Sequence, residues 1–196
     1  MLRTGCAWDY LPHDFPPADT VYGYLRKCQA DSTWERLHDA LRREVRIQAG
    51  KNPVPTAAIM DSQSVKTTER GGLRLGGVRC GEESQWRKRH LLVDTLGLLW
   101  GLVVHNAGVQ DRDGSKLWLE RARQEPALRE RLQNFWADGG YRGTLEAWVT
   151  AHDDCVLEIV RRADGGKGFV VLSHRWVVER TLGWLKRWRR LSKDYE

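Results

Sequence analysis

Three acidic residues occupy positions at which a catalytic carboxylate would be useful. Asp61 follows the short apolar run 57–60, and Asp138 follows a second such run, 134–137. A side chain at the end of a buried strand is fixed by the sheet yet open to solvent. The two glycines after Asp138 would also let backbone or substrate approach it closely. A local interpretation stays open for each acid, because Asp-Gly-Gly can be a simple turn and Asp61 can cap the segment after it.

The third acid, Glu179, belongs to a predicted long helix over 174–190. At 100° per residue, Arg175, Glu179 and Lys186 fall within about 40° of one another, so a carboxylate is flanked by two cations. The opposite arc is apolar and aromatic and is expected to pack inward; it comprises Val177, Val178, Thr181, Trp184, Leu185, Trp188 and Leu191. The alternative is a surface ladder of charges, which contributes little stability.

Carboxylates that converge repel one another unless a cation neutralises them. Oxygen ligands of this kind suit Mg²⁺, for which Mn²⁺ can substitute. Two such ions about 3.5–4 Å apart activate the attacking oxygen and stabilise the leaving oxygen in phosphodiester cleavage. The residue types at Asp61, Asp138 and Glu179 therefore predict this chemistry, although sequence positions alone place each acid only at the edge of an element.

The elements that must position these acids alternate along the chain. Strands are expected at 57–60, 90–94, 98–105, 134–137 and 155–160, with a hairpin turn at 95–97. Helices are expected over 116–132, interrupted near Pro126, over 145–151 and over 174–190. This order predicts an α/β domain with a mixed sheet flanked by helices. Two further helices, 20–28 and 33–47, precede a Pro- and Gly-containing linker, 49–55, so we expect a small helical module over 1–52 and the α/β domain over 53–196.

Composition and charge are typical of a soluble protein that binds a polyanion. Hydrophobic residues make up 41% of the 196 residues and charged residues 30%, and no run is long enough for a membrane span or a secretory signal. We therefore expect a cytoplasmic protein whose four scattered cysteines are reduced. The net charge is +6, with basic clusters at 87–90 and 186–190 that would attract phosphates. A solvated helix face is the alternative for either cluster.

Several motifs in order resemble the DDE transposases of insertion sequences, in the family numbered five and close to the family numbered four. The motifs are Asp61-Ser62-Gln63-Ser64-Val65-Lys66-Thr67, Lys88-Arg89-His90-Leu91-Leu92-Val93-Asp94, Val109-Gln110-Asp111-Arg112-Asp113-Gly114, Ala137-Asp138-Gly139-Gly140-Tyr141 and Arg175-Trp176-Val177-Val178-Glu179-Arg180-Thr181. The resemblance implies a ribonuclease H-like fold in which Asp61, Asp138 and Glu179 are catalytic and bind Mg²⁺. The first 37 residues resemble the family's helical N-terminal module, which is expected to bind DNA or a second protomer.

The resemblance also implies partners and a set of DNA-binding residues. Arg175 and Lys186 match the family's spacing of Arg, three residues, Glu, six residues and Lys, whereas Leu172 replaces the family's tyrosine. The expected partners are terminal inverted repeats, target DNA and further copies of the chain, in a bacterial cytoplasm at the nucleoid, and no membrane. The residues expected to contact DNA are Arg175, Lys186, Arg180, Lys66, Arg87, Lys88 and Arg89.

Departures from the family pattern keep other functions open. The chain begins inside the N-terminal module and ends where the family usually continues, and segment 79–86 carries Glu82 and Glu83 in place of lysines. A truncated copy is therefore expected. The leading hypothesis is a metal-dependent transposase that cleaves element ends and joins them to target DNA. The alternatives are a non-catalytic DNA-binding remnant and an unrelated metal-dependent nuclease of the same fold.

Overall fold

The computed structural model describes residues 1–67, 86–122, 124–152, 155–160 and 174–193. Its contacts divide the chain into two units. One unit comprises Met1–Pro53 with Leu185–Ser192, and the other consists chiefly of Val54–Trp184. The divergent segment 79–85, Leu172 and Cys80 lie outside the described residues. Cys6, Cys28 and Cys155 are free thiols, and no helix in the described part of the chain is long and apolar enough to span a bilayer.

The first unit is helical. Its elements are the 3₁₀ helix η1 (Trp8–Tyr10), α1 (Ala18–Ala30), α2 (Thr33–Gln48) and the short α7 (Arg189–Ser192). Backbone bonds tie α7 to the N-terminal segment, since the Arg190 N–H donates to the Leu2 carbonyl at 3.1 Å. Leu37, Leu41 and Val45 recur every four residues and give α2 one apolar face, which is solvent-exposed, with Leu41 57% exposed.

The second unit is built on a five-stranded mixed sheet. The strands are β1 (Ala57–Lys66), β2 (Trp86–Asp94), β3 (Leu99–Asn106), β4 (Asn134–Ala137) and β5 (Val156–Ile159), in the order β3-β2-β1-β4-β5. β1, β2 and β3 pair antiparallel, whereas β4 pairs parallel with both β1 and β5. The predicted mixed α/β sheet flanked by helices is confirmed, and the architecture is consistent with a ribonuclease H-like fold.

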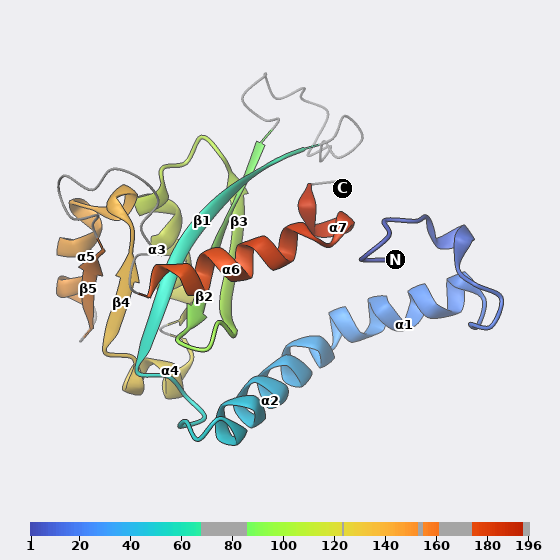
Figure 1. The fold of residues 1–196 in the computed structure, drawn as a ribbon, viewed down its shortest axis with the longest axis horizontal. Coiled ribbons are helices and arrows are strands. Elements are labelled where there is room, and N and C mark those ends of the chain that lie inside the picture. The colour runs from blue at the N-terminus through green and yellow to red at the C-terminus, as the bar shows by residue number, and fades with distance from the viewer. Residues whose placement is uncertain (68–85, 123, 153–154, 161–173, 194–196) are drawn as a thin grey trace. The chain divides into compact units, whose positions relative to one another are not determined.

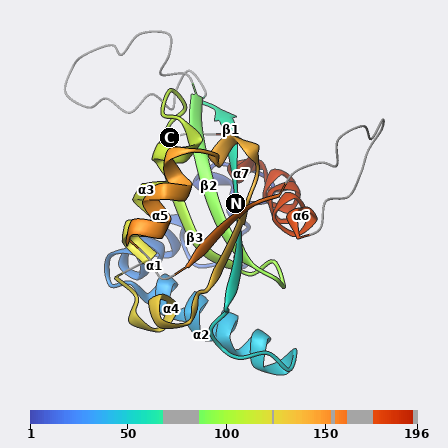
Figure 2. The ribbon, with the colours of Figure 1, turned by 90° about the vertical axis from the view of Figure 1, so that its left-hand side faces the viewer.

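Helices cover both faces of this sheet (Figures 1 and 2). One face carries α3 (Asp111–Ala122), α4 (Pro126–Arg131) and α5 (Thr144–His152), and α6 (Arg175–Lys186) crosses the other face. The interruption predicted near Pro126 is confirmed as the break between α3 and α4. The main core lies under α3, α4 and α5 and is formed by fully buried side chains such as Leu92, Leu119, Phe135, Tyr141 and Leu145.

The expected end of the first strand was wrong. β1 does not stop at Met60 but continues to Lys66, so Asp61 lies inside the strand, opposite Leu91. The polar residues after Asp61 hide this continuation from a search for apolar runs. They form strand because each is paired with β2, out to Lys66 opposite Trp86. Asp61 is consequently followed along the chain by strand residues rather than by a loop.

The predicted long helix over 174–190 was also wrong in two respects. α6 ends at Lys186, and α7 begins separately at Arg189. The inward face consists of Val177, Val178, Thr181 and Leu182, whereas Trp184 is 50% exposed. Because the buried arc is turned toward Leu182, Trp184 lies at its edge. There its ring packs against the Arg180 guanidinium, 4.7 Å from the ring centroid.

Candidate active site

Asp61 is held rigidly in the central strand β1. It is 9% exposed, and its Oδ1 accepts the Ser62 backbone N–H at 2.7 Å. Burial raises the pKa of the Asp61 carboxyl to about 6, against the lowering effects of the Ser62 hydrogen bond and the Arg175 charge. The charges of Asp138 and Glu179 raise the same pKa further. A bound cation would therefore stabilise the ionised form of Asp61.

Asp138 leaves the adjacent parallel strand β4 and begins a tight turn. Its Oδ1 accepts the Gly140 N–H at 2.9 Å and caps the 3₁₀ helix η3 (Gly139–Tyr141). The turn interpretation of Asp-Gly-Gly is thus correct. The turn is compatible with a role in a site, because the second carboxylate oxygen, Oδ2, lies 3.7 Å from Arg175 Nη2. β1 and β4 are parallel neighbours, which brings the two aspartates to the same part of the sheet.

Arg175 gathers the three acids. Its Nη2 lies 3.7 Å from Asp61 Oδ2, 3.7 Å from Asp138 Oδ2 and 3.4 Å from Glu179 Oε1. Glu179 is one helical turn after Arg175 in α6, as the helical period predicted. Glu179 is the most exposed of the three acids, with a side chain 48% exposed. The structure therefore brings together three carboxylates that are 41 to 118 residues apart in sequence.

The arrangement fits a divalent cation in its donor chemistry. One oxygen from each of three carboxylates faces a common positive charge, and hard oxygen donors are the ligands of Mg²⁺ and Mn²⁺. Within the described ranges, no group of three His, Cys, Asp or Glu side chains is as close together as a bound metal requires. The Arg175 guanidinium lies between the acids and offsets part of their repulsion.

Comparison with known families agrees with this geometry. A family model described as "Transposase DDE domain" matches residues 52–196. The chain belongs to this DDE transposase family. A second model, described as "Putative transposase of IS4/5 family", matches residues 1–38 and supports an insertion-sequence transposase. No relative among curated proteins matches the chain.

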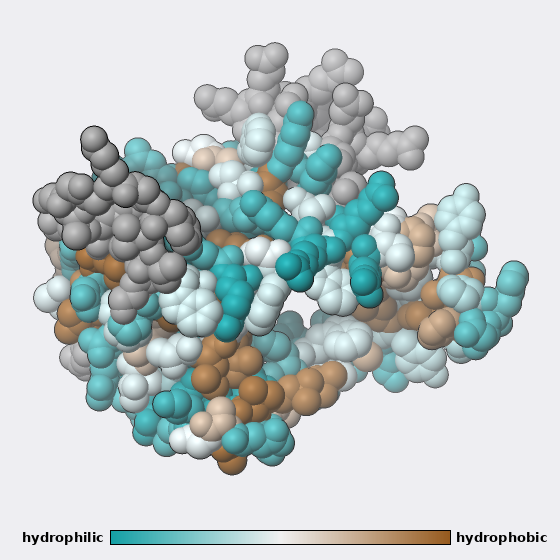
Figure 3. Space-filling model, in the orientation of Figure 1, coloured by the Kyte–Doolittle hydropathy of each residue, from teal (hydrophilic) through white to brown (hydrophobic). Residues whose placement is uncertain are grey.

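The residues predicted to contact DNA occupy different environments in the transposase domain. Lys66 ends β1 and Lys186 ends α6, and both are exposed, while Arg87 and Lys88 on β2 are half-buried. Hydrophilic side chains also gather over α6 on the face shown in Figure 3. The DNA contacts of these residues remain predictions.

Two of the predicted DNA-binding arginines have structural partners. Arg89 is 8% exposed and donates from Nη2 to Gln63 Oε1 at 3.0 Å. The Arg180 guanidinium lies between the rings of Trp176 and Trp184 and donates to the Leu96 carbonyl at 2.9 Å. It thereby anchors α6 to the turn between β2 and β3. If either arginine contacts DNA, it does so in addition to these structural contacts.

The structure adds polar residues that sequence reasoning did not assign to the site. Asp111 at the start of α3 accepts the Ser62 hydroxyl at 2.7 Å and the Lys88 ammonium at 3.1 Å. Behind it, His90 Nδ1 lies 3.0 Å from the Tyr141 hydroxyl, and burial lowers the pKa of His90 to about 4, so the ring is neutral. Asp111 lies in one of the motifs that resemble the family. No local sequence pattern predicted its contact with Ser62, which is 49 residues away.

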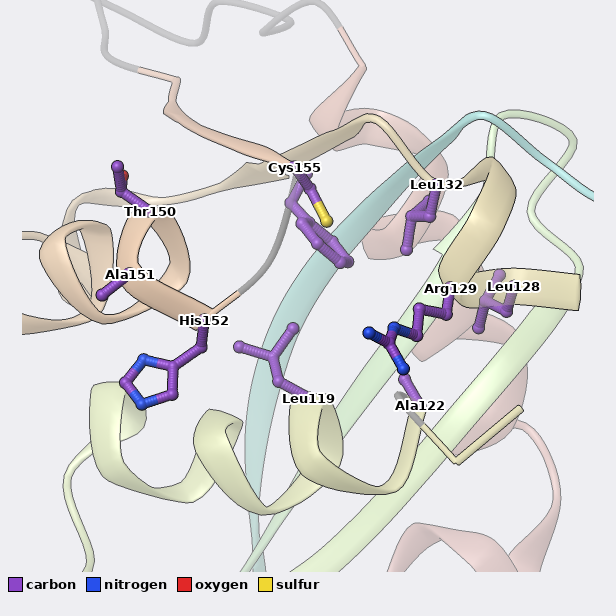
Figure 4. A pocket seen from close by; sticks show the side chains of 10 residues that line it. Leu119, Ala122, Leu128, Arg129, Leu132, Thr150, Ala151, His152 and Cys155 are labelled. Carbon is purple, nitrogen blue, oxygen red and sulfur yellow. The ribbon is translucent and has the colours of Figure 1, made fainter. Parts of the chain in front are cut away.

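A separate pocket lies away from the acids, among α3, α4 and α5 (Figure 4). Leu119, Leu128, Leu132 and Phe135 form its apolar wall, and Arg129 also lines it. None of the three acids lines this pocket, so it is not part of the carboxylate site of the transposase domain.

Proposed function

We propose that this chain is a metal-dependent transposase that cleaves DNA at the ends of an insertion sequence and transfers those ends to target DNA. The observation that carries the proposal is the convergence of Asp61, Asp138 and Glu179 on one guanidinium group. Water would attack a phosphodiester at the element end and release a 3′-hydroxyl. That hydroxyl would then attack a phosphodiester of the target strand, forming a new ester bond to the target phosphate and releasing the 3′-hydroxyl of the target strand.

Asp61, Asp138 and Glu179 are the residues that would hold Mg²⁺ or Mn²⁺. When bound, such ions polarise the phosphate and lower the pKa of the attacking oxygen. The donor set supports this assignment, because three acids with one buried and desolvated member are stabilised by an added positive charge. Asp61 supplies the rigid part of the set, since it lies inside β1 and is paired with Leu91 of β2.

The chain's own cations have separate tasks in this proposal. Arg175 neutralises the acids in the absence of metal and is then available to a DNA phosphate, with which guanidinium forms paired hydrogen bonds. The exposed Lys66 at the end of β1 and the exposed Lys186 at the end of α6 each offer a positive charge to the phosphate backbone of the element end. These contacts position the strand and carry no sequence information.

The decisive experiment is cleavage of a labelled duplex that carries the terminal inverted repeat flanking the coding sequence, with Mn²⁺ or Mg²⁺. The wild-type chain should release a product with a 3′-hydroxyl. Asp138→Asn should bind the duplex but cut at least about 1,000-fold more slowly, because a metal ligand is worth several kcal/mol in the transition state.

Asp113→Asn is the matched control, because this acid is exposed and pairs with Lys116 at 3.1 Å on the same helix. It should cut at the wild-type rate. Equal background from the wild type and Asp138→Asn would exclude catalysis. Binding to the inverted repeat without a product, with or without metal, would identify the chain as a non-catalytic DNA-binding remnant. Cleavage without preference for the repeat would instead identify a general nuclease.

A further inference from the structure

A second polar cluster lies beside Asp61 and Asp138 and is centred on Asp111. The Asp111 Oδ1 accepts hydrogen bonds from Ser62 Oγ at 2.7 Å and from Lys88 Nζ at 3.1 Å. These three residues come from α3, β1 and β2. The pKa of the Asp111 carboxyl is lowered by these donors, despite burial, so the residue is a carboxylate. Three elements thus meet at a single charged oxygen.

This cluster adjoins two of the proposed catalytic acids. Ser62 follows Asp61 and donates its backbone N–H to that carboxylate, while its hydroxyl binds Asp111. On the other side, a Cβ atom added to Gly140 would lie 3.1 Å from Asp138 Oδ1 and 3.4 Å from Asp111 Oδ2. Both carboxylates therefore face the same glycine. Asp111 is therefore connected to Asp61 through Ser62 and lies across Gly140 from Asp138.

Lys88 is the member of the cluster that can act on DNA. Its ammonium is held between Asp111 Oδ1 and the Val109 carbonyl, each at 3.1 Å, with the side chain 14% exposed. A lysine side chain is ordinarily flexible, and two fixed acceptors remove that freedom. An ammonium has three N–H donors. Among the described residues, two donors are used, which leaves one for a phosphate oxygen.

The side chains beneath Asp111 are closely packed, and the lowered pKa of His90 keeps that ring neutral. His90 is 1% exposed, its ring stacks on His105 with centroids 4.8 Å apart, and its Nδ1 meets the Tyr141 hydroxyl. His90 Nε2 lies 3.9 Å from Asp111 Oδ1. An added Cβ at Gly114 would collide with both histidine rings, so α3 is packed as closely as its sequence allows. Asp111 therefore has little room to move.

We propose that Asp111 is a positioning residue of the transfer reaction, which fixes Lys88 against a phosphate of the DNA strand that lies over Asp61 and Asp138. The inference rests on the proposed function. A bare carboxylate beside a DNA strand repels it, whereas one committed to Lys88 adds no net charge to the surface. Its effect is to turn a mobile cation into one with a fixed position.

The test is Asp111→Asn, which keeps the size of the side chain and an acceptor for Ser62 but removes the charge that holds Lys88. The DNA dissociation constant should change little, because the loss of a negative charge offsets the loss of the fixed Lys88 contact with a phosphate. The cleavage rate at saturating DNA should fall on the order of 10- to 100-fold, since small misplacements cost that much. Tighter binding with an unchanged or faster rate would overturn the proposal, because Asp111 would then be only a repulsive surface charge.

Lys88→Met tests the same ion pair by removing the cation. It should reduce the cleavage rate by a similar factor, and the double variant should be no slower than Lys88→Met alone, because both changes disable one unit. Independent, multiplying losses would overturn the proposal. If Asp111→Asn lowers the unfolding temperature, Lys88→Met decides alone, and an unchanged rate there refutes positioning by Lys88. Asp113→Asn, in the same first turn of α3, is the control and should change neither constant.

A measurement of DNA binding, which does not depend on cleavage, tests the role of Asp111 independently of the proposed function. In equilibrium binding to the terminal duplex without metal, Lys88→Met should reduce the salt slope by about one phosphate contact. In an Asp111→Asn background, Lys88→Met should change the slope much less. An equal change in both backgrounds would refute positioning, even if the wild type cuts DNA. If the wild type does not cut, the transposase proposal fails while this difference in slopes still decides the role of Asp111.

Discussion

At the scale of single residues, the main feature is a positive charge surrounded by three acids. Arg175 Nη2 lies within 3.7 Å of an oxygen from each. Its own side chain is 16% exposed, so the interaction is only partly screened by solvent. The same guanidinium that stabilises the three carboxylates without metal must compete with any cation that binds them.

Arg175→Ala should therefore tighten the binding of Mn²⁺ to the DNA-free chain. Removing one charge about 4 Å from the acids changes their interaction with a cation by about 1 kcal/mol or more, which is at least about fivefold in dissociation constant. Titration calorimetry measures it. Arg142→Ala removes an equal charge from an exposed position after η3 and should change the constant little. Weaker Mn²⁺ binding by Arg175→Ala would show that the arginine supports the metal site instead.

The sequence predicted contacts between residues well where the two residues are spaced by one helical turn. The pairing of Arg175 with Glu179 follows from helical spacing, and it is observed as an ion pair at 3.4 Å. The contact between Ser62 and Asp111 spans 49 positions, and no local pattern encodes it. The basic run 87–90 also looked uniform in sequence. A strand sends alternate side chains to opposite faces, so Lys88 reaches Asp111 while Arg89 binds Gln63.

At the scale of elements, most of the sheet could be predicted because its strands are short apolar runs. The exceptions are the polar second half of β1 and the first four residues of β2, 86–89, which precede the expected run 90–94. Each of these two segments is paired with the other. The end of α6 was also not predictable, because its sequence remains helix-favouring through Arg190. Elements whose extent depends on partners far along the chain are those that a local pattern describes least well.

The contact between α3 and β3 gives a prediction about stability. The Trp118 ring lies directly against Gly101, where an added Cβ would overlap the indole. Gly101→Ala should lower the free energy of unfolding by at least about 1–3 kcal/mol, since the ring must move. Gly183→Ala in α6 is the matched control: nothing lies within 4 Å of its added Cβ, and helix propensity should stabilise the chain by about 0.5–1 kcal/mol. Urea unfolding of the two variants measures both. Similar midpoints for them would contradict the packing of Trp118.

At the scale of the whole molecule, the positive charge is distributed between structural and exposed side chains. The chain carries 32 Lys and Arg against 26 Asp and Glu. Within the basic run 186–190, Arg190 donates to the Cys6 carbonyl at 3.4 Å, whereas Arg187 is exposed. Net charge alone therefore does not say which residues are available to DNA.

This difference predicts separate effects within one basic run. Arg187→Ala should reduce the slope of log affinity against log salt by about 0.9, the value of one lost phosphate contact, without changing thermal stability. Arg190→Ala should lower the stability of the N-terminal unit, because a side chain-to-backbone hydrogen bond is lost. Binding to the terminal duplex between 50 and 200 mM salt, about the usual range for such effects, measures the first. An unchanged slope for Arg187→Ala would show that the run is a solvated surface.

The way in which α6 is attached to the sheet determines how the site responds to heating. The sheet contributes Asp61 and Asp138, but Glu179 and Arg175 come from a single helix packed on it through Val177, Val178, Thr181 and Leu182. The Thr181 hydroxyl and the Arg180 guanidinium add bonds to the turn at 96–97. Such a helix can detach at a lower free energy than the sheet can unfold. Heat inactivation should then precede melting: the chain would keep its sheet and core while losing two of the four side chains that meet at the site.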